Sequence, residues 1–381
     1  MAKKKRFVRK GVYLPMLAVV VVLTCIGLVM VFSASYNSIA IRSDTASVFS
    51  GVKWQALVAA VGFILIFFMS KLDYHFFAKP RVLTTGFVIA IILLIAVFFC
   101  PSVYDAHRWI SHKSLPVTFQ SSEFAKFVGI IYAAVYTSKN KWWYRSLNDW
   151  IRLLLPIGVI GVLIIAEPDL STTLCYLGAV TIILLVSGMP IRFFIIALCA
   201  MAALIPVMIA IKGYQSRRFA AWLHAWDDPK DVGYQVVQSL YAIGDGGLFG
   251  VGLGNSKQKI THLPMSDTDY IFAIICEEFG FVGAVIVVLL YVAFAFFGIK
   301  IAMEAADKFG AYLAAGITTI IVLQAFVNMG VATNVLPSTG LTLPFISKGA
   351  SSLLIMLWAS GMLLSISAYK KRPDSALKEQ K

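Results

Sequence analysis

The stretch YLPMLAVVVVLTCIGLVMVFS, residues 13–33, contains no charged side chain and follows a strongly basic amino terminus. A helix of about 20 apolar residues can cross the roughly 30 Å hydrocarbon core of a bilayer. The run is too long for the apolar core of a signal peptide, so it predicts a retained transmembrane helix. The remaining sequence has the same character, because 59% of the 381 residues are hydrophobic and 14% are charged. Soluble domains usually carry roughly 25% charged residues.

The hydropathy pattern predicts about ten transmembrane helices. They are expected over residues 13–33, 53–69, 84–100, 124–137, 151–166, 170–187, 191–211, 269–299, 311–333 and 344–368. Lys and Arg residues are concentrated at residues 1–12, in alternate connectors and at residues 370–381. Positive side chains are retained on the cytoplasmic side. The predicted fold is therefore an all-α polytopic membrane protein with both termini in the cytoplasm, forming a single transmembrane domain over residues 1–381.

The formal net charge of +14 does not point to nucleic acid. Basic segments next to a transmembrane helix serve as topology signals and attract anionic membrane lipids. The five cysteines fall within or at the ends of apolar runs and have no metal-ligand or CxxC spacing. We therefore expect membrane lipids as partners, no nucleic acid, and cysteines that pack as small apolar residues.

One connector, residues 212–268, is much longer than the others and is predicted to be extracytoplasmic, between the seventh and eighth helices. Long loops in compact proteins are commonly functional or disordered. This one contains Trp222, Trp226 and other aromatic residues, and residues 235–243 have helical periodicity. We expect it to fold against the membrane surface. Its glycine-rich run, residues 244–254, matches no nucleotide-binding pattern and is interpreted as a tight turn.

Acidic residues at the outer end of the eighth helix are the leading candidates for chemistry. Asp269 is placed where the long loop enters that helix, and it is either a catalytic carboxylate or a plain helix cap. Glu277 and Glu278 follow about two turns later, roughly 12 Å deeper at 1.5 Å per residue. Charges at that depth need partners or a polar cavity, so these two residues form either a structural ion pair or part of a functional site.

Several cations are expected on the same side of the membrane. Arg217 and Arg218 open the long loop and Lys257 and Lys259 close it, so a folded loop would bring them together beside Asp269. A basic pocket beside a carboxylate suits a lipid-linked phosphate or pyrophosphate with a hydroxyl to deprotonate, although headgroup binding without chemistry is the alternative.

Two further pairs precede that loop. Arg108 and Trp109 place a guanidinium next to an interfacial aromatic ring, which suits either phosphate binding or membrane anchoring. Glu123 and Lys126 lie three residues apart on one helix face, where they either pair with each other or line a cavity for the substrate.

Motifs that run through nearly the whole chain resemble the SEDS family of shape, elongation, division and sporulation proteins, and most closely its FtsW and SpoVE branch. The matching segments are residues 108–110, 120–126, 167–170, 233–235, 238–239, 250–256, 263–264, 268–273, 277–278 and 336–347, with residues 349 and 351–352. The segment Gly252–Ser256 favours the division or sporulation branch over the elongation branch.

The resemblance implies a peptidoglycan glycosyltransferase that polymerises lipid II at the outer face of the bacterial cytoplasmic membrane. It implies Asp269 as the catalytic residue, a substrate site that includes Asp169, and a class B penicillin-binding protein as partner within the division or elongation machinery. A divalent cation, Mg²⁺ or Mn²⁺, is a possible cofactor, although no cluster in the sequence has dedicated ligand spacing.

The chain departs from the family pattern at several positions. Ser121 replaces the usual proline of the fourth helix, Glu167 replaces the usual glutamine before Pro168, and Lys348-Gly349-Ala350 replaces an aromatic residue and two glycines. Before Thr268 the chain has Met265-Ser266-Asp267, where the family typically has a glutamate and a histidine. Asp267 is therefore the alternative candidate for the base. Two other functions stay open, a lipid II flippase and a non-catalytic scaffold that recruits the transpeptidase.

Overall fold

The computed structural model describes residues 7–9, 11–42, 50–100, 108–110, 118–140, 143–211, 213–229, 233–261, 263 and 265–371. Ten helices lie where transmembrane helices were expected: α1 (Leu14–Arg42), α2 (Ser50–Lys71), α3 (Pro80–Ala96), α4 (Ser121–Lys139), α5 (Leu147–Ala166), α6 (Leu170–Val186), α7 (Ile191–Ile211), α11 (Ile271–Met303), α12 (Lys308–Ala332) and α13 (Ala350–Ala368). Shorter helices are α8 (Gly213–Leu223), α9 (Tyr234–Asp245) and α10 (Gln258–Thr261), with 3-10 turns Tyr74–Ala78, Val97–Phe99 and Trp143–Arg145. The mainly helical membrane fold is confirmed.

Within the described residues, seven helices are long and apolar enough to cross a membrane: α1, α2, α3, α5, α11, α12 and α13. The apolar stretches Leu170–Val186 and Ile191–Leu204 are shorter. Helix α4, which we expected over residues 124–137, is longer than that and carries buried polar side chains. The last expected helix, residues 344–368, is helical only from Ala350, because residues 333–349 form an irregular segment that caps the bundle.

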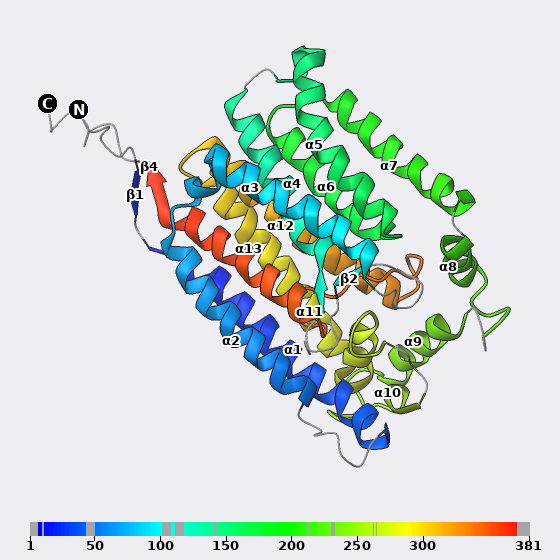
Figure 1. Cartoon of the computed structure of the whole chain (residues 1–381). Coiled ribbons are helices and arrows are strands. Elements are labelled where there is room, and N and C mark those ends of the chain that lie inside the picture. Colours follow the sequence, from blue (N-terminus) through cyan, green and yellow to red (C-terminus); the bar gives the residue numbers. More distant parts are fainter. Residues whose placement is uncertain are drawn as a thin grey trace, which may run out of the picture.

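The two ends of the chain meet at one end of the bundle (Figure 1). Strand β1 (Phe7–Arg9) pairs antiparallel with β4 (Tyr369–Lys371), so that Val8 lies opposite Lys370. A chain whose ends lie on one side of a membrane crosses it an even number of times. Seven crossings would place the ends on opposite sides, whereas an even number of crossings, such as the predicted ten, is compatible with the pairing.

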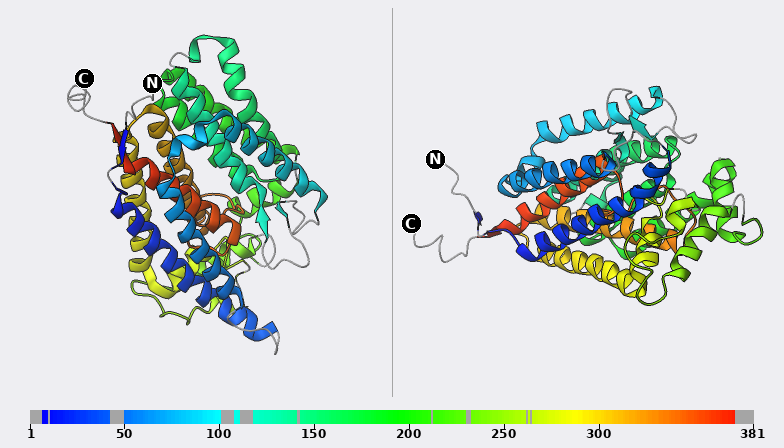
Figure 2. Two further views of the ribbon diagram at one scale, coloured as in Figure 1. Left: turned by 60° about the vertical axis from the view of Figure 1, so that its left-hand side comes forward. Right: turned by 90° about the horizontal axis from the view of Figure 1, so that it is seen from below.

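Helices α12 and α13 form the centre of the bundle, and α2 and α3 lie toward its outside (Figures 1 and 2). In the apolar window of α13, 78% of the residues are buried, against 17% in α3. Large apolar side chains on the outer helices are exposed, as expected for surfaces that contact lipid. Small residues bring α2 and α13 together: a Cβ on Gly361 would lie 2.6 Å from the Met69 Cβ.

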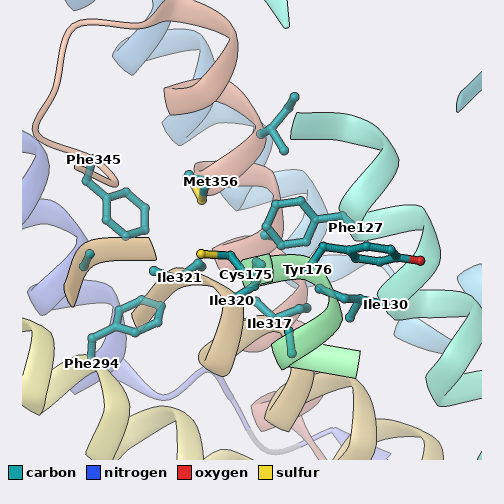
Figure 3. Close-up of a cluster of buried hydrophobic side chains, with 14 of the residues drawn as sticks. Phe127, Ile130, Cys175, Tyr176, Phe294, Ile317, Ile320, Ile321, Phe345 and Met356 are labelled. Atoms are coloured by element: carbon teal, nitrogen blue, oxygen red, sulfur yellow. The ribbon is translucent and has the colours of Figure 1, made fainter. Parts of the chain in front are cut away.

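The interior between these helices is filled with interlocking apolar side chains (Figure 3). Phe127 of α4, Tyr176 of α6, Ile317 of α12 and Met356 of α13 are all fully buried there. Glycine at position 129 leaves room for the Tyr176 ring, because a Cβ there would lie 2.2 Å from its hydroxyl oxygen. This packing fixes the ends of α4, α6 and α12 that lie away from the chain termini, and these ends carry the polar residues described below.

The long connector folds at the end of the bundle opposite the termini, where α8, α9 and α10 lie (Figures 1 and 2). The helix expected over residues 235–243 is present as α9. Hydrogen bonds tie this connector to the end of α12. Among them, the Trp222 Nε1 donates to the Asn334 carbonyl at 3.0 Å, and the Ser239 hydroxyl donates to the Ala332 carbonyl at 2.7 Å.

The glycine-rich turn forms backbone hydrogen bonds with α11. Gly280 (φ 66°) interrupts that helix, which leaves backbone groups on both sides of the break without helical partners. The turn supplies them: the amides of Val251 and Gly252 donate to the carbonyls of Glu277 and Glu278, and the amides of Phe281 and Val282 donate to those of Gly247 and Leu248. We call residues 246–252 with residues 277–282 the glycine joint. It sets the direction of the short helical segment that starts just after Asp269.

Gly250 is expected to be indispensable in this joint. Its φ of +80° disfavours side chains, and a Cβ would lie 2.2 Å from the Glu278 carbonyl oxygen. Gly250→Ala should destabilise the protein by about 2 kcal/mol or more, through strain and overpacking. In the matched control Gly244→Ala, the glycine is inside α9 with open space around it, so stability should stay the same or rise. Thermal unfolding of the purified proteins tests this, and equal midpoints for the two variants would contradict it.

Candidate active site

Five segments from distant parts of the sequence meet at the end of the bundle opposite the termini. They are Arg108 before strand β2 (Trp109–Ile110), the turn 167–169 between α5 and α6, helix α8 with Arg218, the turn 265–270, and the irregular segment 333–349. Side chains link them: the Arg218 Nη1 donates to the Ser338 carbonyl at 3.3 Å, and a Cβ on Gly340 would lie 2.6 Å from the Arg108 Nη1.

Asp269 is half-buried in this group, in the turn that precedes α11. Its backbone is fixed from two sides, because the Asn328 Nδ2 donates to the Asp269 carbonyl at 2.8 Å and the Ser347 hydroxyl donates to the Thr268 carbonyl at 2.6 Å. Within the described part of the chain, its carboxylate accepts no hydrogen bond. The carboxylate is thus held in place and left available for a ligand.

The electrostatic environment of Asp269 has two opposing parts. Burial, with smaller contributions from Asp267 and Asp169, raises the pKa of the carboxyl to about 7, while Arg218 and Arg108 act to lower it. A carboxyl with a pKa near neutrality can both take up and release a proton under physiological conditions. Asp269 is therefore suited to general-base chemistry.

Arg108 and Arg218 are the cations that act on Asp269. Arg108 is only 4% exposed, and its guanidinium donates to the main-chain carbonyls of Glu167, at 3.4 Å from Nε, and of Pro168. Carbonyl partners position a guanidinium without neutralising it. Arg108 therefore presents positive charge beside the carboxylate, and the charge of Arg218 acts on the same carboxylate. Trp109 is half-buried and lies opposite Gln120 in the pair formed by β2 and β3 (Phe119–Gln120).

The other loop cations do not all gather at Asp269. Lys259 was expected there, but its ammonium is buried and pairs with Glu278 at 2.6 Å, with the Ser33 hydroxyl 2.9 Å away. Lys257 and Arg217 have exposed side chains, and the backbone amide of Lys257 donates to the Glu277 carboxylate at 2.7 Å. Lys259 therefore holds the loop to the bundle.

Glu277 and Glu278 have partners from other elements. Glu277 accepts hydrogen bonds from the Ser256 hydroxyl and from the amides at the start of α10. Glu278 accepts from both Lys259 and Ser33. We expected either a structural ion pair or part of a functional site, and for Glu278 the structure shows the ion pair. Both carboxylates stabilise the glycine joint, at which the short helical segment that follows Asp269 ends.

Glu123 and Lys126 also pair, at 2.6 Å, and both are buried. The Lys126 ammonium donates to Gln324 at 2.7 Å, while Ser352 donates to Glu123 at 3.3 Å. Gln324 in turn donates to the Thr342 carbonyl at 3.1 Å. This network connects α4, α12 and α13 to the segment 333–349. These partners of Glu123 and Lys126 are thus protein groups, as in the paired alternative of our prediction.

Asp169 and Asp267 also have local partners. The Asp169 carboxylate caps α6 through the Thr172 amide, at 3.2 Å, and accepts from the Thr172 hydroxyl at 2.8 Å. Asp267 pairs with Lys348 at 2.6 Å near the surface. Of the two acids in the Asp-Thr-Asp sequence, Asp267 is therefore paired, while Asp269 is not paired within the described residues.

Residues of the site that we did not single out from the sequence lie on α12 and in segment 333–349. Gln324 and Asn328 are one helical turn apart and fully buried. Gln324 donates to the segment 333–349, and Asn328 donates both to that segment and to the Asp269 carbonyl. Amide side chains inside an apolar helix were the signal that could have identified them, because polar groups in such helices are costly unless they have partners.

No group of three or more His, Cys, Asp or Glu side chains that could hold a metal ion is found among the described residues. Arg108 and Arg218 act on the Asp269 carboxylate, and a carboxylate beside arginines suits an anionic ligand that carries a hydroxyl group.

Comparisons with known proteins agree with this architecture. The model of the FtsW/RodA/SpoVE family, described as cell cycle proteins, matches residues 14–372. Stage V sporulation protein E of Bacillus subtilis (strain 168) is 35% identical over 361 residues, covering 93% of this chain and 96% of that protein. A probable peptidoglycan glycosyltransferase FtsW of Geobacter sp. (strain M18) is 35% identical over 367 residues, covering 94% and 97%.

Solved structures share the fold. A chain from a structure described as showing coordination of polymerization and crosslinking by a peptidoglycan synthase complex has a TM-score of 0.73 and 25% identity, covering 93% of this chain and 97% of that one. The rod shape determining protein RodA of Thermus thermophilus has a TM-score of 0.65 and 22% identity, covering 93% and 96%, and supports the fold alone.

Proposed function

Because this chain belongs to the FtsW/RodA/SpoVE family of cell cycle proteins, we propose that it is a peptidoglycan glycosyltransferase that polymerises lipid II at the outer face of the bacterial cytoplasmic membrane. The observation that carries the proposal is Asp269, a half-buried carboxyl with a pKa of about 7 that lies beside Arg108 and Arg218 at one end of a membrane bundle. Related proteins named as FtsW glycosyltransferases match over nearly the full chain.

The proposed reaction joins two lipid-linked sugars. Ionised Asp269 takes the proton from the acceptor hydroxyl while that oxygen attacks the anomeric carbon of the donor, with inversion. The bond from the anomeric carbon to the diphosphate oxygen breaks, and undecaprenyl pyrophosphate leaves with the bonding electron pair. Arg108 and Arg218 stabilise the negative charge that develops on the diphosphate. Oriented guanidinium groups suit phosphate oxygens because they donate two hydrogen bonds in a planar arrangement.

The described residues build no dedicated site for a divalent cation. Mg²⁺ commonly binds through one or two carboxylates together with substrate phosphates. We therefore propose that Mg²⁺ or Mn²⁺, where present, would enter with the diphosphate, and the steps above use only side chains of the protein.

We also propose a transpeptidase partner. The structural neighbour comes from a peptidoglycan synthase complex that combines polymerization with crosslinking. A class B penicillin-binding protein would supply the crosslinking activity for this chain. The full-length relatives are named for sporulation and as FtsW, so we propose a role in cell division or sporulation.

Polymerisation of labelled lipid II tests the proposed function. Purified protein in detergent, alone and with a candidate class B penicillin-binding protein, should convert lipid II into glycan chains that muramidase digests. Transfer of lipid II across protein-containing vesicles without polymer would favour a flippase. Absence of polymer under both conditions, with the partner bound, would favour a scaffold.

A further inference from the structure

Glu167 is a buried acid that the proposed reaction does not use. It lies in the turn between α5 and α6, directly before Pro168 and Asp169, and its exposed fraction is 0%. The Ser121 hydroxyl donates to its Oε1 at 3.0 Å. Its Oε2 is buried and has no hydrogen-bond partner within the described residues. A carboxylate in this position would be a buried charge with little compensation, which is unfavourable.

Among the described residues, no charged side chain forms a direct ion pair with Glu167. Arg108 faces it, but the guanidinium donates to the main-chain carbonyls of residues 167 and 168. Asp169 follows two residues later, and its negative charge opposes ionisation of Glu167. Burial is the largest influence and Ser121 and Arg108 oppose it, with the result that the pKa of Glu167 is raised to about 9.

The positive charge of Arg108 interacts with two carboxyl groups. It acts on the ionisation of Glu167 and also on that of Asp269. A negative charge on Glu167 would hold the guanidinium at the 167–168 turn and reduce its attraction to a phosphate. A neutral Glu167 leaves that charge available. The protonation state of Glu167 therefore matters to the diphosphate side of the site.

We propose that Glu167 is a protonated carboxyl of this site, and that it acts in its neutral form as a positioning residue for Arg108. The inference rests on the proposed function, because the group that Arg108 would bind is the substrate diphosphate. Since Oε1 accepts from Ser121, the proton lies on Oε2, which is buried and has no partner among the described residues. Glutamine is uncharged, has nearly the same shape as glutamate and carries a donor group. Glu167→Gln should therefore preserve the function of a neutral Glu167, whereas Glu167→Ala should lose it.

Polymerisation rates from pH 6 to pH 10 test this role. In the wild type, the rate should fall as pH rises through about 9, where Glu167 ionises. Glu167→Gln should lose this alkaline decline and keep a rate within about threefold of the wild type at pH 7.5, whereas Glu167→Ala should be reduced about tenfold or more. The matched control Glu304→Gln changes an exposed carboxyl at the other end of the bundle and should keep the wild-type profile. An unchanged alkaline decline in Glu167→Gln would overturn the proposal.

Thermal unfolding supplies a measurement that does not depend on activity. Between the usual glutamate pKa of about 4.3 and the folded value of about 9, the folded state holds a proton that the unfolded state has lost, so stability falls as pH rises through this window. The midpoint of Glu167→Gln should match the wild type near pH 5, exceed it by a widening margin up to pH 9, and then stay at that margin. A constant difference would overturn the protonated state even if polymerisation is observed. A widening difference without any polymerisation would instead count against the proposed function.

Discussion

Asp269→Asn is expected to lower the rate of lipid II polymerisation by roughly 10²- to 10⁴-fold, which is the range that a general base contributes. Asparagine has nearly the same shape as aspartate but cannot accept the proton of the acceptor hydroxyl. The main-chain contacts of Asn328 and Ser347 to this turn do not involve the Asp269 side chain, so the local structure should persist. Binding of labelled lipid II, measured in parallel, should remain, and polymer should not form.

The matched control is Asp267→Asn, two residues earlier. Asp267 pairs with Lys348 near the surface, where such pairs contribute at most about 1 kcal/mol, so its loss should leave most of the activity. Wild-type polymerisation by Asp269→Asn would exclude Asp269 as the base. Inactivity of a normally folded Asp267→Asn would show that Asp267 is required as well and would reopen the choice between the two acids.

The same assignment predicts an acid limb in the pH dependence. Asp269 must be ionised to accept a proton, and its pKa is raised to about 7. The rate should therefore drop about tenfold for each unit below that value and level off above it. Together with the decline that we expect from Glu167, the wild-type profile should be bell-shaped, with its maximum between the two pKa values.

The sequence identified the parts of the site that depend on local pattern. Charge-free runs located the helices, and the position of Asp269 at the entrance of an apolar helix marked it as a candidate. Arg108 and Arg218 could be named because arginines beside a membrane helix are few and chemically distinctive. These signals lie within short segments, so they can be read without knowing the fold.

Contacts between residues that are far apart in the sequence could not be predicted from such local patterns. Lys259 was expected beside Asp269 because both lie near the end of the long loop. Its actual partners are Glu278 and Ser33, and Ser33 is 226 residues away in the sequence. The glycine-rich run was interpreted as a turn, which is correct locally, but its role depends on the break of α11 at Gly280. Spacing along the chain indicates neither contact.

The pair between Lys259 and Glu278 is therefore the next feature to test, because it joins the loop to the bundle near Asp269. Both side chains are about 1% exposed or less, and the Nζ to Oε1 distance is 2.6 Å. Removing one partner from a buried pair leaves an uncompensated charge and typically costs about 3–5 kcal/mol. We expect losses of this size for Lys259→Met and for Glu278→Gln, measured by thermal unfolding of the purified proteins.

The double variant Lys259→Met/Glu278→Gln should be more stable than the sum of the single changes predicts, because no unpaired charge remains. Lys257→Met is the control, since the Lys257 side chain is exposed and its contact to Glu277 is made by the backbone amide. Polymerisation should decrease with each single variant, because the pair supports the glycine joint, at which the short helical segment that follows Asp269 ends. Additive losses of stability would mean that the two residues act independently, and the loop would then have to be held by its contacts to α12 and by the backbone hydrogen bonds of the joint.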